Sequence, residues 1–143
     1  MLKFIELFAG IGGFRIGLEK NEKYKCLWAN EVDKYACQIY RKNFGEKELV
    51  EGDIRKISAE DIPDHNLLTA GFPCQSFSIA GKRKGFNDTR GTLFFEICRI
   101  AKVKRPTLLL LENVKGLLNH DSGNTFRIIL DSLSERVPAV VIK

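Results

Sequence analysis

Two side chains in the sequence have the chemistry of a covalent catalyst, the thiol of Cys74 and the carboxyl group of Glu112. Cys74 follows Pro73 in a polar stretch, a setting that suits a thiolate nucleophile. Glu112 ends the apolar run 108–111, where desolvation should favour a protonated carboxyl group that can donate its proton. The alternatives are an inert core thiol and a strand-end acid that caps a neighbouring loop.

A glycine-rich segment, Gly10-Ile11-Gly12-Gly13, could let the backbone approach a ligand closely, because residues without Cβ leave room and tolerate positive φ. Glu31 follows Gly10 by 21 positions and could accept hydrogen bonds from both hydroxyl groups of a ribose. The spacing is G-x-G-G rather than G-x-G-x-x-G, so it suits a pyrophosphate less well. A cofactor loop and a plain tight turn both remain open for this segment.

Apolar runs that alternate with amphipathic stretches should position these residues. Strands are expected at 3–8, 25–30, 49–50, 66–70 and 107–111, and a sixth should begin near 138. Helices are expected at 14–21, 33–44, 92–104 and from Asn124, which could cap the last helix. The apolar stripe of 33–44 would be Ala36, Ile39 and Tyr40. This alternation predicts an α/β fold with a doubly wound, mostly parallel sheet.

The polar features of the sequence follow the predicted strands. In open parallel sheets, ligands bind beyond the carboxyl ends of the strands. The five strand ends carry the Gly10 segment, Glu31, Asp53, Pro73-Cys74-Gln75 and Glu112-Asn113. A chance sequence would scatter such features, so one rim of the sheet should hold the functional site. Cys26, Cys37 and Cys98 lie inside predicted elements and are interpreted as core thiols.

Composition sets broad limits on function. The 143 residues suffice for one domain with a real core. A net charge of +5 fits a polyanionic partner only weakly. No apolar run approaches the ~18 residues of a membrane span, and the N-terminus lacks the form of a signal peptide, so a cytoplasmic protein is expected. Four cysteines without C-x-x-C spacing and two histidines argue against disulfides and metal sites.

The segments FAGIGG, GFPCQSFS and ENV, in this order, resemble the cofactor, nucleophile and glutamate motifs of the cytosine-C5 DNA methyltransferases. EGDI and KGFNDTRGTLFF extend the likeness, which runs from Phe4 to about Leu133 and is strongest to small bacterial enzymes of restriction-modification systems. The resemblance implies a Rossmann-like fold that binds S-adenosylmethionine, and double-stranded DNA as partner. Cys74 would attack C6 of a flipped cytosine, and Glu112 would hold N3 and the exocyclic amine while C5 is methylated.

The resemblance also assigns a cofactor site. Phe8 would pack on the adenine, Glu31 would hold the ribose, and Asp53 would accept the adenine amine. The remaining expected cofactor residues are Ala9, Gly10, Ile11, Gly12, Val32, Ile54, Pro73 and Leu93. Val32 stands where some members of the family carry an aromatic ring, which would weaken stacking on the adenine.

The segment 78–91 is similar to the loop that closes over DNA in this family. Residues expected at the DNA are Gln75, Ser76, Ser78, Lys82, Arg83 and Lys84, with the three basic residues at phosphates. The alternative is a solvated charged loop.

Residues 1–143 are interpreted as part of a catalytic domain, because the sequence holds no target-recognition region and no segment that returns to the cofactor pocket. The sheet is expected to be incomplete at its C-terminal side, and the chain alone should transfer little or no methyl. It would be a fragment, one subunit of a split enzyme that needs a second chain, or a truncated pseudo-enzyme. The competing functions are a transfer-RNA cytosine methyltransferase, a nicotinamide-dependent oxidoreductase and a non-catalytic module that binds a cofactor or partner.

Overall fold

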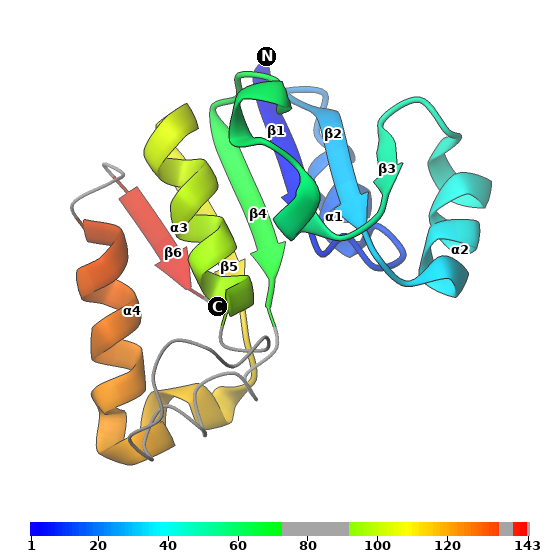
Figure 1. The fold of residues 1–143 in the computed structure, drawn as a ribbon. Helices are drawn as coiled ribbons and strands as arrows, with labels where there is room; N and C mark the ends of the chain where they lie inside the picture. Colours follow the sequence, from blue (N-terminus) through cyan, green and yellow to red (C-terminus); the bar gives the residue numbers. More distant parts are fainter. Residues whose placement is uncertain (73–91, 135–138, 143) are drawn as a thin grey trace.

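The computed structural model describes residues 1–72, 92–134 and 139–142. A six-stranded sheet in the order β3-β2-β1-β4-β5-β6 forms the centre of the molecule (Figure 1). Its strands are β1 (Leu2–Leu7), β2 (Tyr24–Glu31), β3 (Leu49–Glu51), β4 (Leu67–Gly71), β5 (Leu108–Glu112) and β6 (Ala139–Ile142). Each neighbouring pair is parallel, so the carboxyl ends of all six strands lie on one rim. The predicted doubly wound α/β fold is confirmed.

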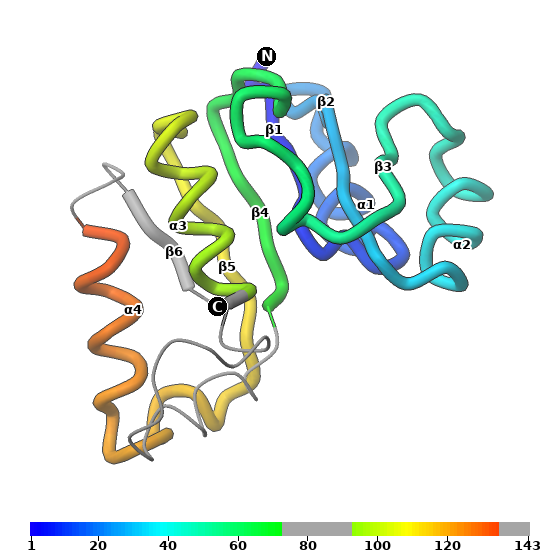
Figure 2. Tube along the Cα trace, in the orientation of Figure 1, coloured from blue at the N-terminus to red at the C-terminus, as the bar shows by residue number. Residues whose placement is uncertain are grey.

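The helices lie on both faces of this sheet. They are α1 (Gly13–Leu18), α2 (Lys34–Phe44), α3 (Thr92–Lys104) and α4 (Asn124–Ser134), with short 3-10 helices η1 (Ile54–Lys56), η2 (Ala59–Asp61) and η4 (Lys115–Gly123). Helix α3 lies in front of β5 and beside β4 in Figure 1, and α1 lies behind the sheet. Figure 2 shows α2 beside β3 at one end of the sheet and α4 at the other. The chain thus begins at the centre, moves out to β3 and returns at β4, which creates the switch in strand order between β1 and β4.

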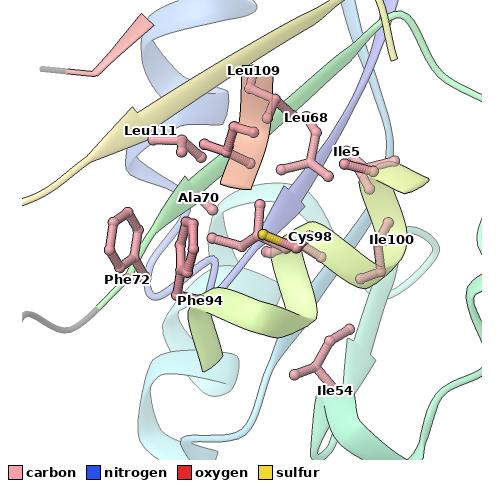
Figure 3. Packing of buried hydrophobic residues seen from close by; sticks show 14 of the residues in the cluster. Ile5, Ile54, Leu68, Ala70, Phe72, Phe94, Cys98, Ile100, Leu109 and Leu111 are labelled. Carbon is pink, nitrogen blue, oxygen red and sulfur yellow. The ribbon is translucent and has the colours of Figure 1, made fainter. Parts of the chain in front are cut away.

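The core follows from the alternation of side chains along the central strands. Ile5 and Leu7 of β1 are fully buried on one face, where they join Phe94 and Ile97 of α3 in the largest apolar cluster (Figure 3). Phe4 points to the opposite face, where it packs with Cys26 and Leu67 beneath α1. Parallel strands covered on both faces are apolar at most positions, which explains the nearly continuous apolar runs in the sequence.

Three local expectations need correction. The buried face of α2 is formed by Cys37 and Tyr40, whereas Ile39 is 45% exposed. Tyr40 belongs to the predicted apolar stripe, but the observed buried face is rotated toward Cys37 and away from Ile39. Asn124 lies inside α4, and its side chain bonds Asp121 and Arg127 rather than a backbone N–H at the helix start. The helix α1 ends at Leu18 instead of residue 21. The predicted burial of the three core thiols, Cys26, Cys37 and Cys98, is confirmed.

Candidate cofactor and catalytic site

The carboxylate of Glu31 organises the rim beyond β1 and β2. Its Oε2 accepts a hydrogen bond of 2.7 Å from the backbone N–H of Gly10. Its Oε1 accepts bonds of 2.8 Å each from the N–H groups of Val32 and Asp33. Glu31 is 9% exposed, so burial leaves these backbone donors as its immediate environment. The residue therefore ties the glycine-rich segment to the end of β2, and one of about four lone-pair positions on its carboxylate is left for a ligand.

The loop after β1 holds three residues in the left-handed region of backbone space. Phe8 has φ 54°, Gly10 has φ 56° and Gly12 has φ 90°. A positive φ is unfavourable for a bulky side chain, and such strain is found disproportionately at ligand sites. A Cβ added at Gly12 would lie 2.3 Å from Cε2 of Phe44, so this glycine is required by packing against α2 as well as by φ.

A cavity of about 340 Å³ opens beside this loop, within the size range of small-ligand pockets. It is lined by Phe8, Asn30, Val32, Gly52, Asp53, Ile54, Arg55 and Leu93. Five of these residues were expected at the cofactor: Phe8, Val32, Asp53, Ile54 and Leu93. The fold brings them together from the ends of β1, β2 and β3 and the start of α3. Of the other expected cofactor residues, Ala9 and Gly12 are buried and Ile11 is 49% exposed, and none of these three lines the cavity. Gly10 and Glu31, which are joined by a hydrogen bond, are also not among the lining residues.

Three lining residues, Asn30, Gly52 and Arg55, were not anticipated from the sequence. Asn30 is 2% exposed, and its Nδ2 donates to the carbonyl groups of Val50 and Gly52 at 2.9 Å each. The Asn30 amide thus fastens the end of the short strand β3 to β2. The sequence feature that could have identified Asn30 is its position as a polar residue inside an apolar strand, because a buried polar side chain normally requires a specific hydrogen-bonding partner.

The carboxylate of Asp53 is paired with the guanidinium group of Arg55. Nε of Arg55 lies 2.9 Å from Oδ1 and 3.0 Å from Oδ2, and Nη2 lies 2.6 Å from Oδ2. The backbone N–H of Arg55 also donates to Oδ1 at 3.0 Å. The Arg55 side-chain hydrogen bonds, followed by this backbone bond, lower the pKa of Asp53 to about 2. Asp53 is therefore a hydrogen-bond acceptor on the cavity wall at neutral pH.

Replacing Arg55 with Gln should raise the pKa of Asp53 from about 2 toward the ordinary aspartate value of about 3.9. The reason is that the charge-assisted bonds favour the carboxylate form. A pH titration of the Asp53 carboxyl carbon by NMR would measure the change, with Lys56→Gln as the control for a neighbouring charge without those bonds. An equal shift in the Lys56 variant would contradict the assignment to Arg55. Because the folded pKa is depressed, the stabilisation from this pair is present above about pH 4 and is lost as the pH falls toward 2.

The second part of the rim surrounds Glu112, the last residue of β5. Glu112 pairs with Gly71 across the sheet, and a Cβ added at Gly71 would lie 3.0 Å from Oε2 of Glu112. The glycine thus leaves space for the carboxylate. Glu112 is exposed in the described structure, so the expected desolvation of its carboxyl group is not present. The reason is its position, because it follows the last apolar residue of β5 and stands at the open rim.

Asn113 connects this rim to the end of β4. Its Nδ2 donates to the carbonyl oxygen of Phe72 at 2.7 Å, and its Oδ1 accepts from the N–H of Val114 at 2.8 Å. Phe72 is buried, and its ring centroid lies 5.6 Å from that of Phe94 at the start of α3 (Figure 3). The residue immediately before the Pro73-Cys74 pair is therefore held by both β5 and α3. Cys74 and the expected residues Pro73, Gln75, Ser76, Ser78, Lys82, Arg83 and Lys84 lie outside the described residues.

The part of the chain that the structure describes contains no group of three or more His, Cys, Asp or Glu side chains arranged to hold a metal ion. Among the same residues, every helix is too short or too polar to cross a membrane.

The fold is a Rossmann-like α/β fold with a cavity at the carboxyl ends of the strands, where proteins of this architecture bind ligands. Over residues 2–136 the sequence matches the family described as C-5 cytosine-specific DNA methylase, and the chain belongs to that family.

Several relatives and one solved structure are similar to this chain over most of its length. Type II methyltransferase M1.ScrFI of Lactococcus lactis subsp. cremoris is 58% identical, over 93% of this chain and 34% of that protein. M.HhaI of Haemophilus parahaemolyticus is 53% identical, over 94% and 40%, and M.NgoBI of Neisseria gonorrhoeae is 59% identical, over 94% and 42%. The crystal structure of the S. pombe Dnmt2 methyltransferase matches with a TM-score of 0.73 and 30% identity, over 92% of this chain and 42% of that one. The chain spans well under half the length of each of these proteins.

Proposed function

We propose that this chain carries the S-adenosylmethionine site and the catalytic cysteine and glutamate of a DNA cytosine-C5 methyltransferase. The observation that supports it best is the cavity at the strand ends, whose lining includes five residues that the family motifs assign to the cofactor. The named relatives at 53–59% identity are all Type II methyltransferases, which favours DNA over transfer RNA as substrate. Membership of this family removes the nicotinamide-dependent oxidoreductase as an alternative.

The residues of the cavity suit an adenosyl group. The ring of Phe8 and the side chains of Ile54 and Leu93 offer apolar surface for the adenine, and the ionised Asp53 offers an acceptor for its amine. The buried carboxylate of Glu31 lies at the neighbouring strand end, where its remaining lone-pair position could accept a hydrogen bond from one ribose hydroxyl group. S-adenosylmethionine, when bound, supplies the methyl group.

The catalytic steps would use side chains at the adjoining strand ends. The Cys74 thiolate would add to C6 of a cytosine flipped out of the duplex, which makes C5 nucleophilic. Glu112, at the end of β5, would hold N3 and the exocyclic amine, and would supply or share a proton at N3 as charge develops on the ring. After methylation, transfer of the C5 proton to a water molecule and elimination of the Cys74 thiolate restore the aromatic base. In this proposal Gln75, Ser76 and Ser78 contact the DNA, and Lys82, Arg83 and Lys84 contact its phosphates.

A calorimetric titration of S-adenosylmethionine into the purified chain tests the cofactor site, with NAD as the control ligand. We expect saturable binding of S-adenosylmethionine and no binding of NAD. Binding of NAD alone would refute the proposal. Failure of both ligands to bind to a cooperatively folded chain would refute the proposal that this chain carries the cofactor site.

Methyl transfer tests the substrate and the nucleophile. Labelled methyl groups are offered to double-stranded DNA and to transfer RNA, with the chain alone and with the C-terminal remainder of a relative supplied in trans. Incorporation should be confined to DNA and should fall to background in Cys74→Ser. Incorporation into transfer RNA alone, or activity that survives Cys74→Ser, would contradict the proposal.

A further inference from the structure

The segment that carries Asp53 is supported from two sides. After the three-residue strand β3, the chain runs through Gly52 and Asp53 into η1. The Asn30 amide holds the β2 side of this segment through two carbonyl groups. On the opposite side stands α3, whose Arg99 lies 45 positions away in sequence from Ile54.

Arg99 binds the backbone carbonyl groups of the first residue of η1 and of the residue that follows this helix. Its Nη2 donates to the carbonyl oxygen of Ile54 at 3.1 Å and to that of Ile57 at 2.9 Å. Glu96, one turn earlier on α3, holds the same guanidinium group at 2.6 Å from Nη2 and 2.8 Å from Nε. The Glu96 side chain is 14% exposed and the Arg99 side chain 34% exposed, so this ion pair is partly shielded from solvent. The planar guanidinium group presents several donors in fixed directions, which suits it to hold two carbonyl groups and a carboxylate at once.

These contacts fix the part of the cavity wall that presents Asp53. Asp53 is the N-cap of η1, and its Oδ1 accepts the N–H of Arg55 inside that helix. Ile54, whose carbonyl group Arg99 binds, lines the cavity itself. Leu93, six residues before Arg99 on α3, lines the same cavity. Ile54 and α3 also share the large apolar cluster (Figure 3). Arg99 therefore sets the distance between two walls of the pocket without lining it.

We propose that Arg99 is a positioning residue that orients Asp53 toward the exocyclic amine of the cofactor's adenine, and that it thereby determines the selectivity of the pocket for adenine. This inference rests on the proposed cofactor site. If Arg99 is removed, η1 keeps its apolar anchor Ile54 but loses the two polar contacts that fix its backbone. The Asp53 carboxylate then presents its lone pairs over a wider range of directions, and a directional hydrogen bond to the amine weakens.

The chain offers a matched control on the same helix. Lys104 of α3 also binds the connection between β3 and β4, through Nζ to the carbonyl oxygen of Glu60 at 3.2 Å and to Oδ1 of Asp64 at 3.0 Å. Its side chain is 12% exposed. Glu60 belongs to η2, which does not line the cavity. Lys104→Met therefore removes a cation from the same helix and the same connection, away from the proposed adenine site.

The experiment measures dissociation constants by calorimetry for S-adenosylhomocysteine and for S-inosylhomocysteine, in which an oxo group replaces the adenine amine. Arg99→Met should weaken binding of the adenosyl ligand roughly tenfold and the inosyl ligand much less, because only the first donates to Asp53. The preference for adenine should therefore fall in Arg99→Met. Arg99→Lys, which keeps one cationic donor, should recover part of the preference, and Lys104→Met should leave it unchanged.

The outcomes distinguish a role of Arg99 in adenine selectivity from a general structural role, and both from a failure of the proposed cofactor site. If the unchanged chain binds the adenosyl ligand but Arg99→Met keeps the same preference, the role of Arg99 is refuted and the proposed function stands. Equal loss for both ligands, or the same loss in Lys104→Met, would assign Arg99 a general structural role instead. If Arg99→Met does not fold, an unchanged preference in a folded Arg99→Lys refutes the inference. If the unchanged chain binds neither ligand, the proposed cofactor site is refuted and the role of Arg99 with it.

Discussion

Gly12→Ala is expected to lower the free energy of unfolding by about 3 kcal/mol, the sum of overpacking and of a positive φ imposed on alanine. The new Cβ would lie 2.3 Å from Cε2 of Phe44 and 3.1 Å from Cε2 of Tyr40. The Phe44 ring cannot move away easily, because its centroid lies 4.9 Å from that of Tyr40 and 4.5 Å from Cζ of Arg15. The backbone φ of 90° adds strain that no movement of the ring relieves.

Urea unfolding at equilibrium would measure this change, and Gly10→Ala provides the control. Gly10 also has a positive φ, 56°, but an added Cβ there meets no atom within 4 Å. Its substitution should therefore lower the unfolding free energy by only about 1 to 2 kcal/mol, the contribution of the backbone alone. Equal losses in the two variants would show that the contact with Phe44 contributes nothing. A partial recovery in Gly12→Ala combined with Phe44→Leu would identify the ring as the source.

The order and type of the elements could be predicted because a parallel sheet covered by helices demands unbroken apolar strands between amphipathic segments. The predicted bounds of β5 differ from the observed ones by one residue at each end, and those of α3 agree. The stripe on α2 could not be placed, because Ile39 and Cys37 are both apolar and only the packing of Tyr40 near Arg15 decides which one is buried. Periodicity restricts the buried face of a helix, but its rotation is set by tertiary contacts.

The candidate site was predictable where the residues lie at strand ends. Phe8, Val32 and Asp53 stand within two residues of β1, β2 and β3, so topology alone brings them to one rim. Arg55 and Arg99 could not be found in this way. Arg55 follows Asp53 by two positions, a spacing that many exposed charges share. Arg99 acts over a separation of more than 40 residues through backbone carbonyl groups, which leave no trace in the sequence.

Glu6 is a third residue whose environment the sequence does not reveal. It is the second-last residue of β1, is 0% exposed, and accepts a hydrogen bond of 3.1 Å at Oε1 from the N–H of Phe14 in α1. Its other oxygen, Oε2, is buried without a hydrogen-bonding partner. The nearby Arg15 directs its guanidinium group to Glu19 at 2.9 Å and to Glu48 at 3.4 Å instead. Desolvation by burial therefore raises the pKa of Glu6 to about 7.

The wild-type chain should lose about 2 to 3 kcal/mol of unfolding free energy relative to Glu6→Gln between pH 5 and pH 8. The folded pKa of about 7 lies above the ordinary value of 4.5, so the folded protein holds the proton more tightly than the unfolded chain does. The stabilisation from protonated Glu6 is complete below about pH 4.5 and disappears as the pH rises through 7. The amide of Gln cannot ionise, so this variant avoids the loss.

The comparison between the two proteins isolates Glu6 from other titrating groups. His65, whose pKa is lowered by burial, titrates in both proteins and cancels in the difference. Cys26 does not contribute to the difference, because burial raises the pKa of its thiol to about 11, above the pH range of the measurement. Urea unfolding at pH 5, 6, 7 and 8 gives the two profiles, and Glu22→Gln, at an exposed glutamate, should follow the wild type. Parallel profiles for the wild type and Glu6→Gln would mean that Glu6 is already ionised when folded. The charge of Arg15, which lowers the pKa of Glu6, would then have to outweigh the desolvation of the buried carboxylate.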